Sequence, residues 1–130
     1  MVSLDLRDRL SPLERLILLV SAICHDLGHP GLTNGYQVNA GTELAMVYND
    51  ASPLENYHCA LTFHLLRQAP LLPLNNQDRK AFRKGVIACI LATDIAKQAD
   101  LVAKFKQMAS SFDWKESGQR EMASNGLYLY

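Results

Sequence analysis

The sequence lacks an excess of charge of either sign, because 13 Lys and Arg residues balance 13 Asp and Glu residues. A chain without a net charge has no general electrostatic attraction to nucleic acid or to an anionic membrane surface. The local cluster of Arg79, Lys80, Arg83 and Lys84 is interpreted as the solvated face of a helix. We therefore predict neither nucleic acid nor a membrane as a partner.

Cysteine is scarce, and the three that occur, Cys24, Cys59 and Cys89, lie far apart in the sequence. An odd number at these spacings gives neither a disulfide framework nor a CxxC metal site. Each lies in an apolar stretch, where a free cysteine usually behaves as a small buried hydrophobic residue. The pattern indicates a reducing compartment and predicts a cytoplasmic protein.

A long hydrophobic run is also absent from the sequence. The longest run, 16–24, is too short to span a bilayer and leads directly into a His-Asp pair. Acidic residues within the first fourteen positions are not typical of a secretory signal peptide. These absences predict a soluble chain that is neither membrane-spanning nor secreted.

Helical periodicity is present instead, in a chain of 130 residues whose 48% hydrophobic content suffices for one core. Ser11-Pro12-Leu13-Glu14 and Ser52-Pro53-Leu54-Glu55 have the pattern of a capping box with proline at the first helical position. No segment has the convincing alternation of a strand. We predict an all-α, multi-helical fold, with helices that begin near Pro12, Pro53 and Gln77, a short one over 42–48 and a further one over 95–108.

The first of these helices is apolar on nearly every side, which is typical of a buried, central element. We expect it to end near Gly28, because Pro30 disfavours helical backbone at the residue before it, and a loop to follow over 31–35. Towards the C-terminus the helical pattern stops and the sequence becomes polar. We therefore divide the chain into a helical unit, 1–114, and a divergent, disordered tail, 115–130.

The most informative polar group is His25-Asp26-Leu27-Gly28-His29, at the end of the first apolar helix. Imidazole nitrogen suits zinc, whereas carboxylate oxygen suits magnesium or manganese, so an adjacent pair can serve a mixed two-metal centre. A carboxylate at the end of an apolar helix is costly unless it is paired or bound to metal. A His-Asp dipeptide is nevertheless common by chance, so the spacing alone favours metal binding and a structural role equally.

Other polar residues have an ordinary structural interpretation when each is taken alone. Glu55 fits the capping box, and His58 on an apolar stripe is more often a hydrogen-bonded core histidine than a ligand. Thr93-Asp94, at a helix junction, has the pattern of a cap. His64 has no partner that the sequence identifies, and we assign no role to it.

Together these segments resemble the catalytic domain of class I 3′,5′-cyclic-nucleotide phosphodiesterases, which belong to the HD superfamily. The resemblance extends from about Leu10 to Trp114, so that 1–114 would be a partial catalytic domain. The Ala-Ile-Cys-His-Asp run, the Ser-Pro-Leu-Glu segment and the Ser-Phe-Asp-Trp ending are most similar to the cGMP-specific type-nine subfamily. The motifs that carry the resemblance are Cys-His-Asp-Leu-Gly-His-Pro-Gly (24–31), Thr-Glu-Leu-Ala (42–45), Tyr-Asn-Asp-Ala-Ser-Pro-Leu-Glu-Asn-Tyr-His (48–58) and Ile-Leu-Ala-Thr-Asp (90–94).

The resemblance implies a role for each matching position. His25 matches a direct zinc ligand, and Asp26 matches the catalytic carboxylate that bridges Zn²⁺ and a second ion, Mg²⁺ or Mn²⁺. Ile95 falls where the family has an apolar residue near the substrate pocket. His29, Glu55 and Thr93 match residues that hold the water shell of the second ion. His58 matches a residue beside the site.

In such enzymes the two ions clamp the cyclic phosphate and generate the hydroxide that attacks phosphorus, and a histidine protonates the departing O3′.

The sequence departs from the family pattern at several positions. It lacks the His-Asn-x-x-His segment that supplies the general-acid histidine and one zinc histidine, and also the later metal-binding aspartate and the glutamine and phenylalanine that hold the purine. Gly28 stands where the family has aspartate or glutamate, and Tyr57 replaces the first of two histidines.

Two functional hypotheses follow from the resemblance. The first is a phosphodiesterase of cyclic-nucleotide signalling that hydrolyses cyclic GMP or, as an alternative substrate, cyclic AMP, and is active only in a longer form. The second is a catalytically dead fragment that acts as a binding module, either as a homodimer or paired with a full-length phosphodiesterase. A different HD-superfamily hydrolase is a weaker third interpretation, because the motifs around Glu55 and Thr93 would then be coincidences.

Overall fold

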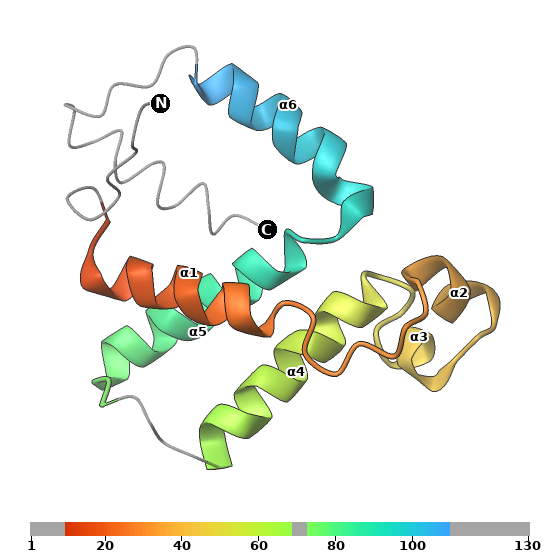
Figure 1. Ribbon diagram of the computed structural model, residues 1–130, viewed down its shortest axis with the longest axis horizontal. Helices are drawn as coiled ribbons and strands as arrows, with labels where there is room; N and C mark the ends of the chain where they lie inside the picture. Colours follow the sequence, from red (N-terminus) through yellow and green to blue (C-terminus); the bar gives the residue numbers. More distant parts are fainter. Residues whose placement is uncertain (1–9, 69–72, 110–130) are drawn as a thin grey trace.

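The computed structural model describes residues 10–68 and 73–109, and every regular element within them is helical (Figure 1). The predicted all-α class is therefore confirmed. In chain order the elements are α1 (Pro12–Cys24), α2 (Asn34–Asn39), α3 (Glu43–Val47), α4 (Pro53–Gln68), α5 (Asn76–Leu91), the 3₁₀ turn η2 (Ile95–Lys97) and α6 (Gln98–Ala109). The predicted tail, 115–130, lies outside the described residues. No helix in the described part of the chain is long and apolar enough to cross a membrane.

Helix α1 begins as its capping box predicts. The Ser11 hydroxyl accepts a hydrogen bond from the Glu14 backbone N–H at 3.2 Å, and the Glu14 carboxylate accepts one from the Ser11 N–H at 2.8 Å. The helix ends at Cys24, earlier than the expected position near Gly28. The segment that follows consists of turns, in which Gly28 and Gly31 have φ angles of +72° and +77°, a left-handed backbone that cannot continue a helix.

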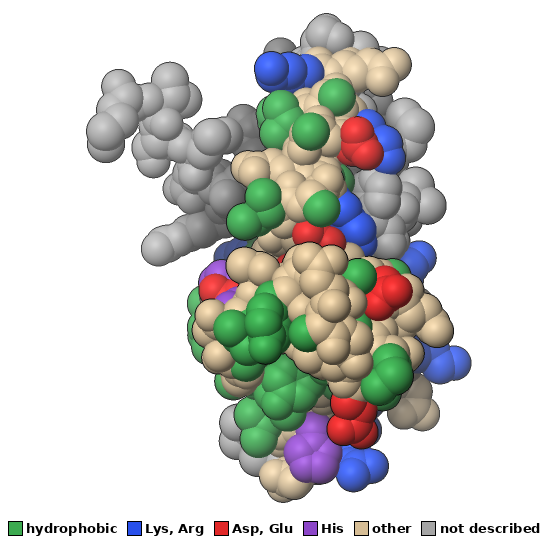
Figure 2. Space-filling view, turned by 90° about the vertical axis from the view of Figure 1, so that its right-hand side faces the viewer, with side chains coloured by type: hydrophobic (Ala, Val, Ile, Leu, Met, Phe, Trp, Pro, Cys, Tyr) green, Lys and Arg blue, Asp and Glu red, His purple; other side chains and the backbone are tan. Residues whose placement is uncertain are grey.

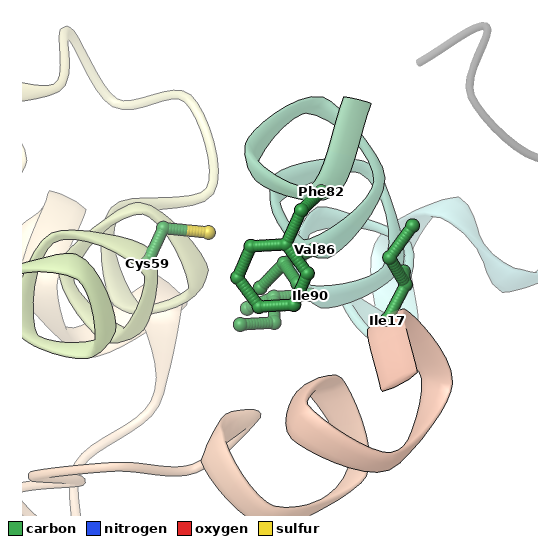
Figure 3. Packing of buried hydrophobic residues seen from close by; sticks show 5 residues of the cluster. All are labelled: Ile17, Cys59, Phe82, Val86 and Ile90. Carbon is green, nitrogen blue, oxygen red and sulfur yellow. The ribbon is translucent and has the colours of Figure 1, made fainter. Parts of the chain in front are cut away.

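One hydrophobic core joins α1, α4 and α5 (Figure 3). α5 packs against both of the other helices, and its contact with α1 is the most extensive in the described structure. Phe82, Val86 and Ile90 recur every four residues along α5, which places them on one face of the helix. They meet Ile17 of α1 and Cys59 of α4, and each of these five side chains is buried.

The expectation that α1 is buried on nearly every side is wrong for the described residues. Within the helix only Ile17 and Ser21 are buried, whereas Leu19 and Ile23 are 60% and 72% exposed. α1 packs on α5 and α4 through one face, and the side chains on its other face have no cover among residues 10–68 and 73–109. The apolar composition of α1 therefore exceeds what its described neighbours bury.

A second, smaller group of helices, α2 and α3, packs against α4 at one end of the molecule (Figure 1). The predicted loop over 31–35 is wrong in its second half, because α2 begins at Asn34. The Thr33 hydroxyl caps this helix by accepting the Tyr36 backbone N–H at 3.1 Å. The short helix predicted over 42–48 is confirmed as α3. Figure 2 faces this end and shows hydrophobic side chains gathered on its surface. The exposed large hydrophobic residues of the segment 32–47 are Leu32, Tyr36, Val38, Met46 and Val47.

The second predicted capping box, at the start of α4, is wrong. The Ser52 hydroxyl donates to Asp94 Oδ2 at 2.7 Å, and Glu55 Oε2 accepts from Asn34 Nδ2 at 2.8 Å. Asn34 Oδ1 accepts the Leu54 backbone N–H at 2.9 Å, so α4 is capped from α2. The same four-residue pattern fails here because Ser52 has a φ of +46°, far from the extended backbone of an N-cap residue.

The remaining helices agree closely with the sequence. α5 begins at Asn76, one residue before the expected position, and the Asn75 side chain caps it by accepting the Asp78 N–H at 2.8 Å. The helix predicted over 95–108 is present as η2 followed by α6. Among the described residues α6 makes no extended contact with α1–α5, and its Val102 and Phe105 side chains are exposed.

Candidate metal centre

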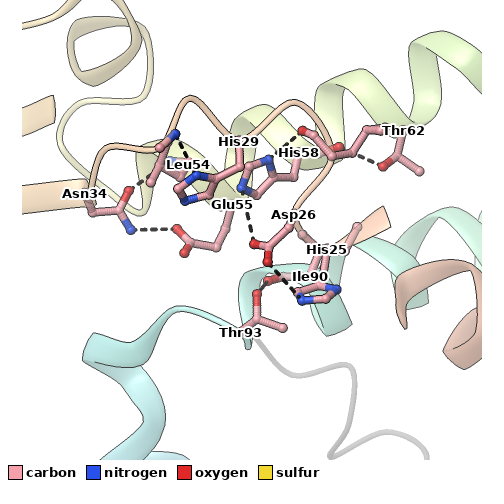
Figure 4. A network of polar contacts seen from close by, with 12 residues as sticks. His25, Asp26, His29, Asn34, Leu54, Glu55, His58, Thr62, Ile90 and Thr93 are labelled. Atoms are coloured by element: carbon pink, nitrogen blue, oxygen red, sulfur yellow. Dashed lines mark hydrogen bonds and ion pairs between the residues drawn. The ribbon is translucent and has the colours of Figure 1, made fainter. Parts of the chain in front are cut away.

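The residues that the sequence singles out as a candidate site all line one cleft, which has a volume of about 610 Å³. They come from three parts of the chain: the turns after α1, the first turns of α4, and the corner between α5 and η2. They are His25, Asp26, His29, Glu55, His58, Thr93 and Ile95. The tertiary structure therefore brings together segments that are up to about seventy residues apart, and Figure 4 shows six of these side chains around the cleft.

The orientation of His25 leaves one ring nitrogen available beside the carboxylate of Asp26. Its Nδ1 lies 3.0 Å from the Ala22 carbonyl, which can only accept, so Nδ1 carries the hydrogen. Nε2 of the neutral ring then holds a lone pair, and it lies 3.3 Å from Asp26 Oδ2. Two electron-pair donors side by side suit a cation, and a ring held through its other N–H is typical of a metal-ligating histidine.

His58 fits both interpretations that the sequence left open. Its side chain is only 2% exposed, and its Nδ1 donates to the Leu27 carbonyl at 2.8 Å, as expected of a hydrogen-bonded core histidine. The same hydrogen bond directs Nε2 into the cleft, where it lies 4.0 Å from Asp26 Oδ1. His58 therefore ties α4 to the turns after α1 and also borders the carboxylate of Asp26.

His29 has the opposite tautomer. Its Nδ1 accepts the Gly31 backbone N–H at 3.0 Å, so the neutral ring carries its hydrogen on Nε2. The ring stacks on that of His58 with 5.7 Å between centroids. Asp26, His29 and His58 each place one potential ligand atom within 4.8 Å of the others. Because Nε2–H is a donor, His29 is better suited to hydrogen-bond the hydration water of an ion than to coordinate the ion directly.

The other side of the cleft offers oxygen acceptors and an apolar rim. Glu55 Oε2 is engaged by Asn34, and Oε1 has no protein partner within residues 10–68 and 73–109. The Thr93 hydroxyl donates to the Ile90 carbonyl at 2.7 Å, which leaves its oxygen free to accept. Ile95 is 82% exposed at the edge of the cleft.

Sequence reasoning missed the roles of Asn34 and Ser52. It also missed one of the two hydrogen bonds of Asp94. Asp94 Oδ1 accepts the Ala96 N–H at 3.0 Å, which confirms the predicted cap, but its Oδ2 accepts from Ser52. Asn34 and Glu55 are 21 residues apart, and Ser52 and Asp94 are 42 residues apart. No local pattern signals pairs at such distances along the chain.

The two departures from the family pattern, Gly28 and Tyr57, lie near each other and both line a second pocket, outside the cleft. A Cβ atom at Gly28 would lie 3.3 Å from Tyr57 Cε1 and would collide with Cδ1 of Leu61. The φ of +72° at this position further disfavours any side chain. The turn that carries Asp26 and His29 is therefore packed against α4 without a side chain between them.

The cysteines do not contribute ligands to the described site. All three are free thiols, and none lines the cleft. Burial raises the pKa of Cys59 from 9.0 to about 11, with the positive charge of Arg83 opposing this and the carboxylate of Glu55 adding to it. Burial also raises the pKa of Cys89. Metals bind the thiolate, and a raised pKa disfavours the thiolate. The candidate ligands of the cleft are therefore imidazole nitrogens and oxygen atoms.

Comparison with known proteins identifies the family. The sequence model of the family described as 3′5′-cyclic nucleotide phosphodiesterase matches residues 1–128. The chain belongs to this family. The phosphodiesterase resemblance in the sequence is thereby confirmed, and the His-Asp pair of the cleft is part of a phosphodiesterase fold.

Relatives and solved structures agree with this assignment. The high affinity cGMP-specific 3′,5′-cyclic phosphodiesterase 9A of Drosophila melanogaster is 50% identical over 113 residues, which are 85% of this chain and 7% of that protein. The Homo sapiens protein of the same name is 46% identical over 113 residues, 85% of this chain and 19% of that protein. The crystal structure of the phosphodiesterase domain of Salpingoeca rosetta rhodopsin phosphodiesterase superposes with a TM-score of 0.78 at 34% identity, covering 90% of this chain and 36% of that chain. The chain therefore spans less than a fifth of these curated phosphodiesterases.

The donor set of this phosphodiesterase cleft fits a divalent metal ion. The carboxylate of Asp26 stands between the Nε2 atoms of His25 and His58, and both rings are held through Nδ1. Nitrogen beside a carboxylate suits Zn²⁺, whereas carboxylate and hydroxyl oxygens suit Mg²⁺ or Mn²⁺. The residues present are thus compatible with the metal dependence of the family.

Proposed function

We propose that this chain supplies part of the metal centre of a 3′,5′-cyclic-nucleotide phosphodiesterase that hydrolyses cyclic GMP in preference to cyclic AMP. The observation that carries the proposal is the convergence of His25, Asp26 and His58 in one cleft, with both imidazole Nε2 atoms directed at the carboxylate. The preference for cyclic GMP is supported by the relatives from Drosophila and human, whose names describe cGMP-specific enzymes. The product would be a nucleoside 5′-monophosphate.

The residues of the cleft divide into two groups in this proposal. His25 would hold Zn²⁺, and Asp26 would hold both Zn²⁺ and a second ion, Mg²⁺ or Mn²⁺. When bound, such ions polarise the cyclic phosphate and lower the pKa of water. The second ion's hydration water would be held by His29 as donor and by Glu55 and Thr93 as acceptors, in keeping with the tautomer of His29 and the free oxygen atoms of the other two.

Two residues complete the proposed site without touching an ion. His58 borders Asp26 and holds the turn that follows it, because its buried ring donates a hydrogen bond to the Leu27 carbonyl. Ile95, exposed at the edge of the cleft, would offer an apolar contact to the substrate. The general acid and the remaining zinc ligands are not among the residues of this sequence that match the family. We therefore propose turnover only in a longer protein, and negligible turnover by this chain alone.

Metal binding by the chain is the first test of this proposal. Zn²⁺ affinity is measured by competition with a chromophoric chelator for the unaltered chain, Asp26→Asn and His25→Ala. We expect each substitution to weaken Zn²⁺ binding by about tenfold or more. Each one removes a metal ligand and also leaves the adjacent ligand less well oriented. Asp100→Asn, at an exposed aspartate of α6 outside the cleft, is the control and should leave the affinity unchanged. Equal affinity in Asp26→Asn would contradict the proposal.

Catalysis is tested in a complete domain. The segment of a phosphodiesterase relative that corresponds to residues 10–109 is replaced by this chain's residues, and hydrolysis of cyclic GMP and cyclic AMP is assayed. We expect hydrolysis that favours cyclic GMP and that is lost in Asp26→Asn but retained in Asp100→Asn. Hydrolysis that survives Asp26→Asn, or none by a folded and metal-loaded hybrid, would overturn the assignment of the site.

A second candidate function, self-association as a dimerisation module, is favoured by the exposed face of α1. Leu18, Leu19 and Ile23 are 39%, 60% and 72% exposed, and exposed apolar side chains that adjoin one another promote association. Sedimentation of the chain should then show a dimer that dissociates in the double variant Leu19→Glu and Ile23→Glu. A monomer at high concentration would rule this function out.

We also propose a cytoplasmic location, in keeping with the free thiols of the described cysteines.

A further inference from the structure

Asn34, the first residue of α2, makes two side-chain hydrogen bonds to the start of α4 (Figure 4). Its Nδ2 donates to Glu55 Oε2 at 2.8 Å, and its Oδ1 accepts the Leu54 backbone N–H at 2.9 Å. An ionised carboxylate can only accept and a backbone N–H can only donate, so one orientation of the amide satisfies both partners. The side chain of Asn34 is therefore fixed at both ends of its amide.

The two hydrogen bonds have different consequences. The bond to Leu54 satisfies one of the N–H groups that a helix leaves unpaired in its first turn, which is a structural role. The bond to Glu55 holds one oxygen of a carboxylate in the wall of the cleft and leaves Oε1 unpaired among the described residues. A glutamate side chain has several accessible rotamers. If a hydrogen bond already holds it in one rotamer, a ligand that needs this rotamer binds without the entropy cost of ordering the side chain.

We propose that Asn34 is a positioning residue, which fixes the carboxylate of Glu55 in the cleft so that Oε1 is available to the hydration water of a divalent ion. This inference rests on the proposed metal-dependent function. It assigns to Asn34 a role in the site itself, in addition to its role in capping α4. Glu55 makes no capping-box bond to Ser52, so the structure gives this carboxylate Asn34 as its hydrogen-bonding partner.

A double-mutant cycle separates positioning from structure. Mn²⁺ affinity of the full chain is measured by electron paramagnetic resonance for the unaltered protein, Asn34→Ala, Glu55→Ala and the double variant. We expect Asn34→Ala to weaken Mn²⁺ binding by about three- to tenfold when Glu55 is present, at or below the lower end for lost outer-shell partners. In the Glu55→Ala background the same change should have less than about a twofold effect, because no carboxylate remains to be positioned. An equal loss in both backgrounds would show a purely structural role and overturn the inference.

A second measurement does not depend on metal. Three-bond couplings of the Glu55 side chain, measured by NMR in the metal-free chain, should indicate one dominant rotamer in the unaltered protein and averaging in Asn34→Ala. Asn34→Asp keeps an acceptor for the Leu54 N–H and removes the donor to Glu55, so it tests positioning while α4 stays capped. A single unchanged Glu55 rotamer in both variants would overturn the inference. Absence of Mn²⁺ binding by the unaltered chain would instead overturn the proposed function, and the couplings would still decide the role of Asn34.

Discussion

The Ser52 hydroxyl donates a 2.7 Å hydrogen bond to Asp94 Oδ2, which is 42 residues further along the chain. Both residues are buried, at 7% and 8% exposure. The bond joins the start of α4 to the corner between α5 and η2, where Thr93 and Ile95 border the cleft. This buried pair therefore joins the wall of the cleft formed by α4 to the wall formed by the corner after α5.

Removal of the Ser52 hydroxyl should therefore destabilise the fold. We expect Ser52→Ala to lower the free energy of unfolding by about 1–3 kcal/mol, because the buried Asp94 carboxylate loses a hydrogen-bond donor. Urea denaturation measures the change. The effects of Ser52→Ala and Asp94→Ala should be less than additive in the double variant, since each removes the same bond. Fully additive losses would show that the two residues act independently.

Three glycine substitutions separate backbone strain from steric conflict. Gly31→Ala should cost about 1–2 kcal/mol through backbone strain alone, because φ is +77° and no atom beyond the two neighbouring residues lies within 4 Å of the added Cβ. Gly28→Ala should cost more, since its Cβ would also collide with Leu61. Gly35→Ala is the control, because this glycine lies within α2, and alanine there should be neutral or stabilise by up to about 1 kcal/mol. Thermal unfolding measures all three, and equal losses in Gly28→Ala and Gly31→Ala would exclude a steric contribution.

The structural role of Nδ1 of His58 can be tested by itself. His58→Ala should lower the free energy of unfolding by about 2–4 kcal/mol, because it leaves a cavity and an unpaired Leu27 carbonyl. His58→Asn places an amide N–H close to the position of Nδ1, so it should recover part of this stability. It cannot replace Nε2, which faces Asp26. Chemical denaturation is the readout, and identical stability of the two variants would contradict a structural hydrogen bond through Nδ1.

Alkaline pH should destabilise the chain through Cys59. The unfolded thiol ionises near its ordinary pKa of 9.0, whereas burial raises the folded pKa to about 11. The unfolded state therefore loses its proton first, so this stabilisation is complete below pH 9 and is lost as the pH rises towards about 11. Urea denaturation at about pH 8 and at about pH 10 should show a smaller decline in Cys59→Ala than in the unaltered chain. Part of the decline should remain, because burial also raises the pKa of Cys89.

Local signals predicted the helices well where the relevant contacts lie within one turn. The capping box at Ser11 is an example, because it depends on residues three positions apart. The same four-residue pattern at Ser52 did not form a capping box. The Ser52 hydroxyl pairs with Asp94 and the Glu55 carboxylate pairs with Asn34, and the left-handed backbone at Ser52 is not that of an N-cap residue. α2 was missed for a related reason, because it has only six residues and depends on packing against α3 and α4.

The candidate site could be predicted as a set of residues but not as an arrangement. The family motifs identified His25, Asp26 and Glu55 among others by position alone. The hydrogen on each imidazole could not be assigned from those motifs, because it depends on whether Nδ1 meets a carbonyl, as in His25, or a backbone N–H, as in His29. The apolar pattern of α1 also gave no indication of which face the described residues leave uncovered.

The amino-acid sequence by itself therefore determined the helical class, the family and seven of the residues that line the cleft, from His25 to Ile95. Periodicity, caps and motifs are properties of neighbouring residues, and they survive without knowledge of the fold. Only the tertiary structure decided which lone pairs enter the cleft and which polar groups hold its walls. Those features arise from hydrogen bonds between distant segments, such as Asn34 with Glu55 and Ser52 with Asp94, and these segments are close together only in the folded chain.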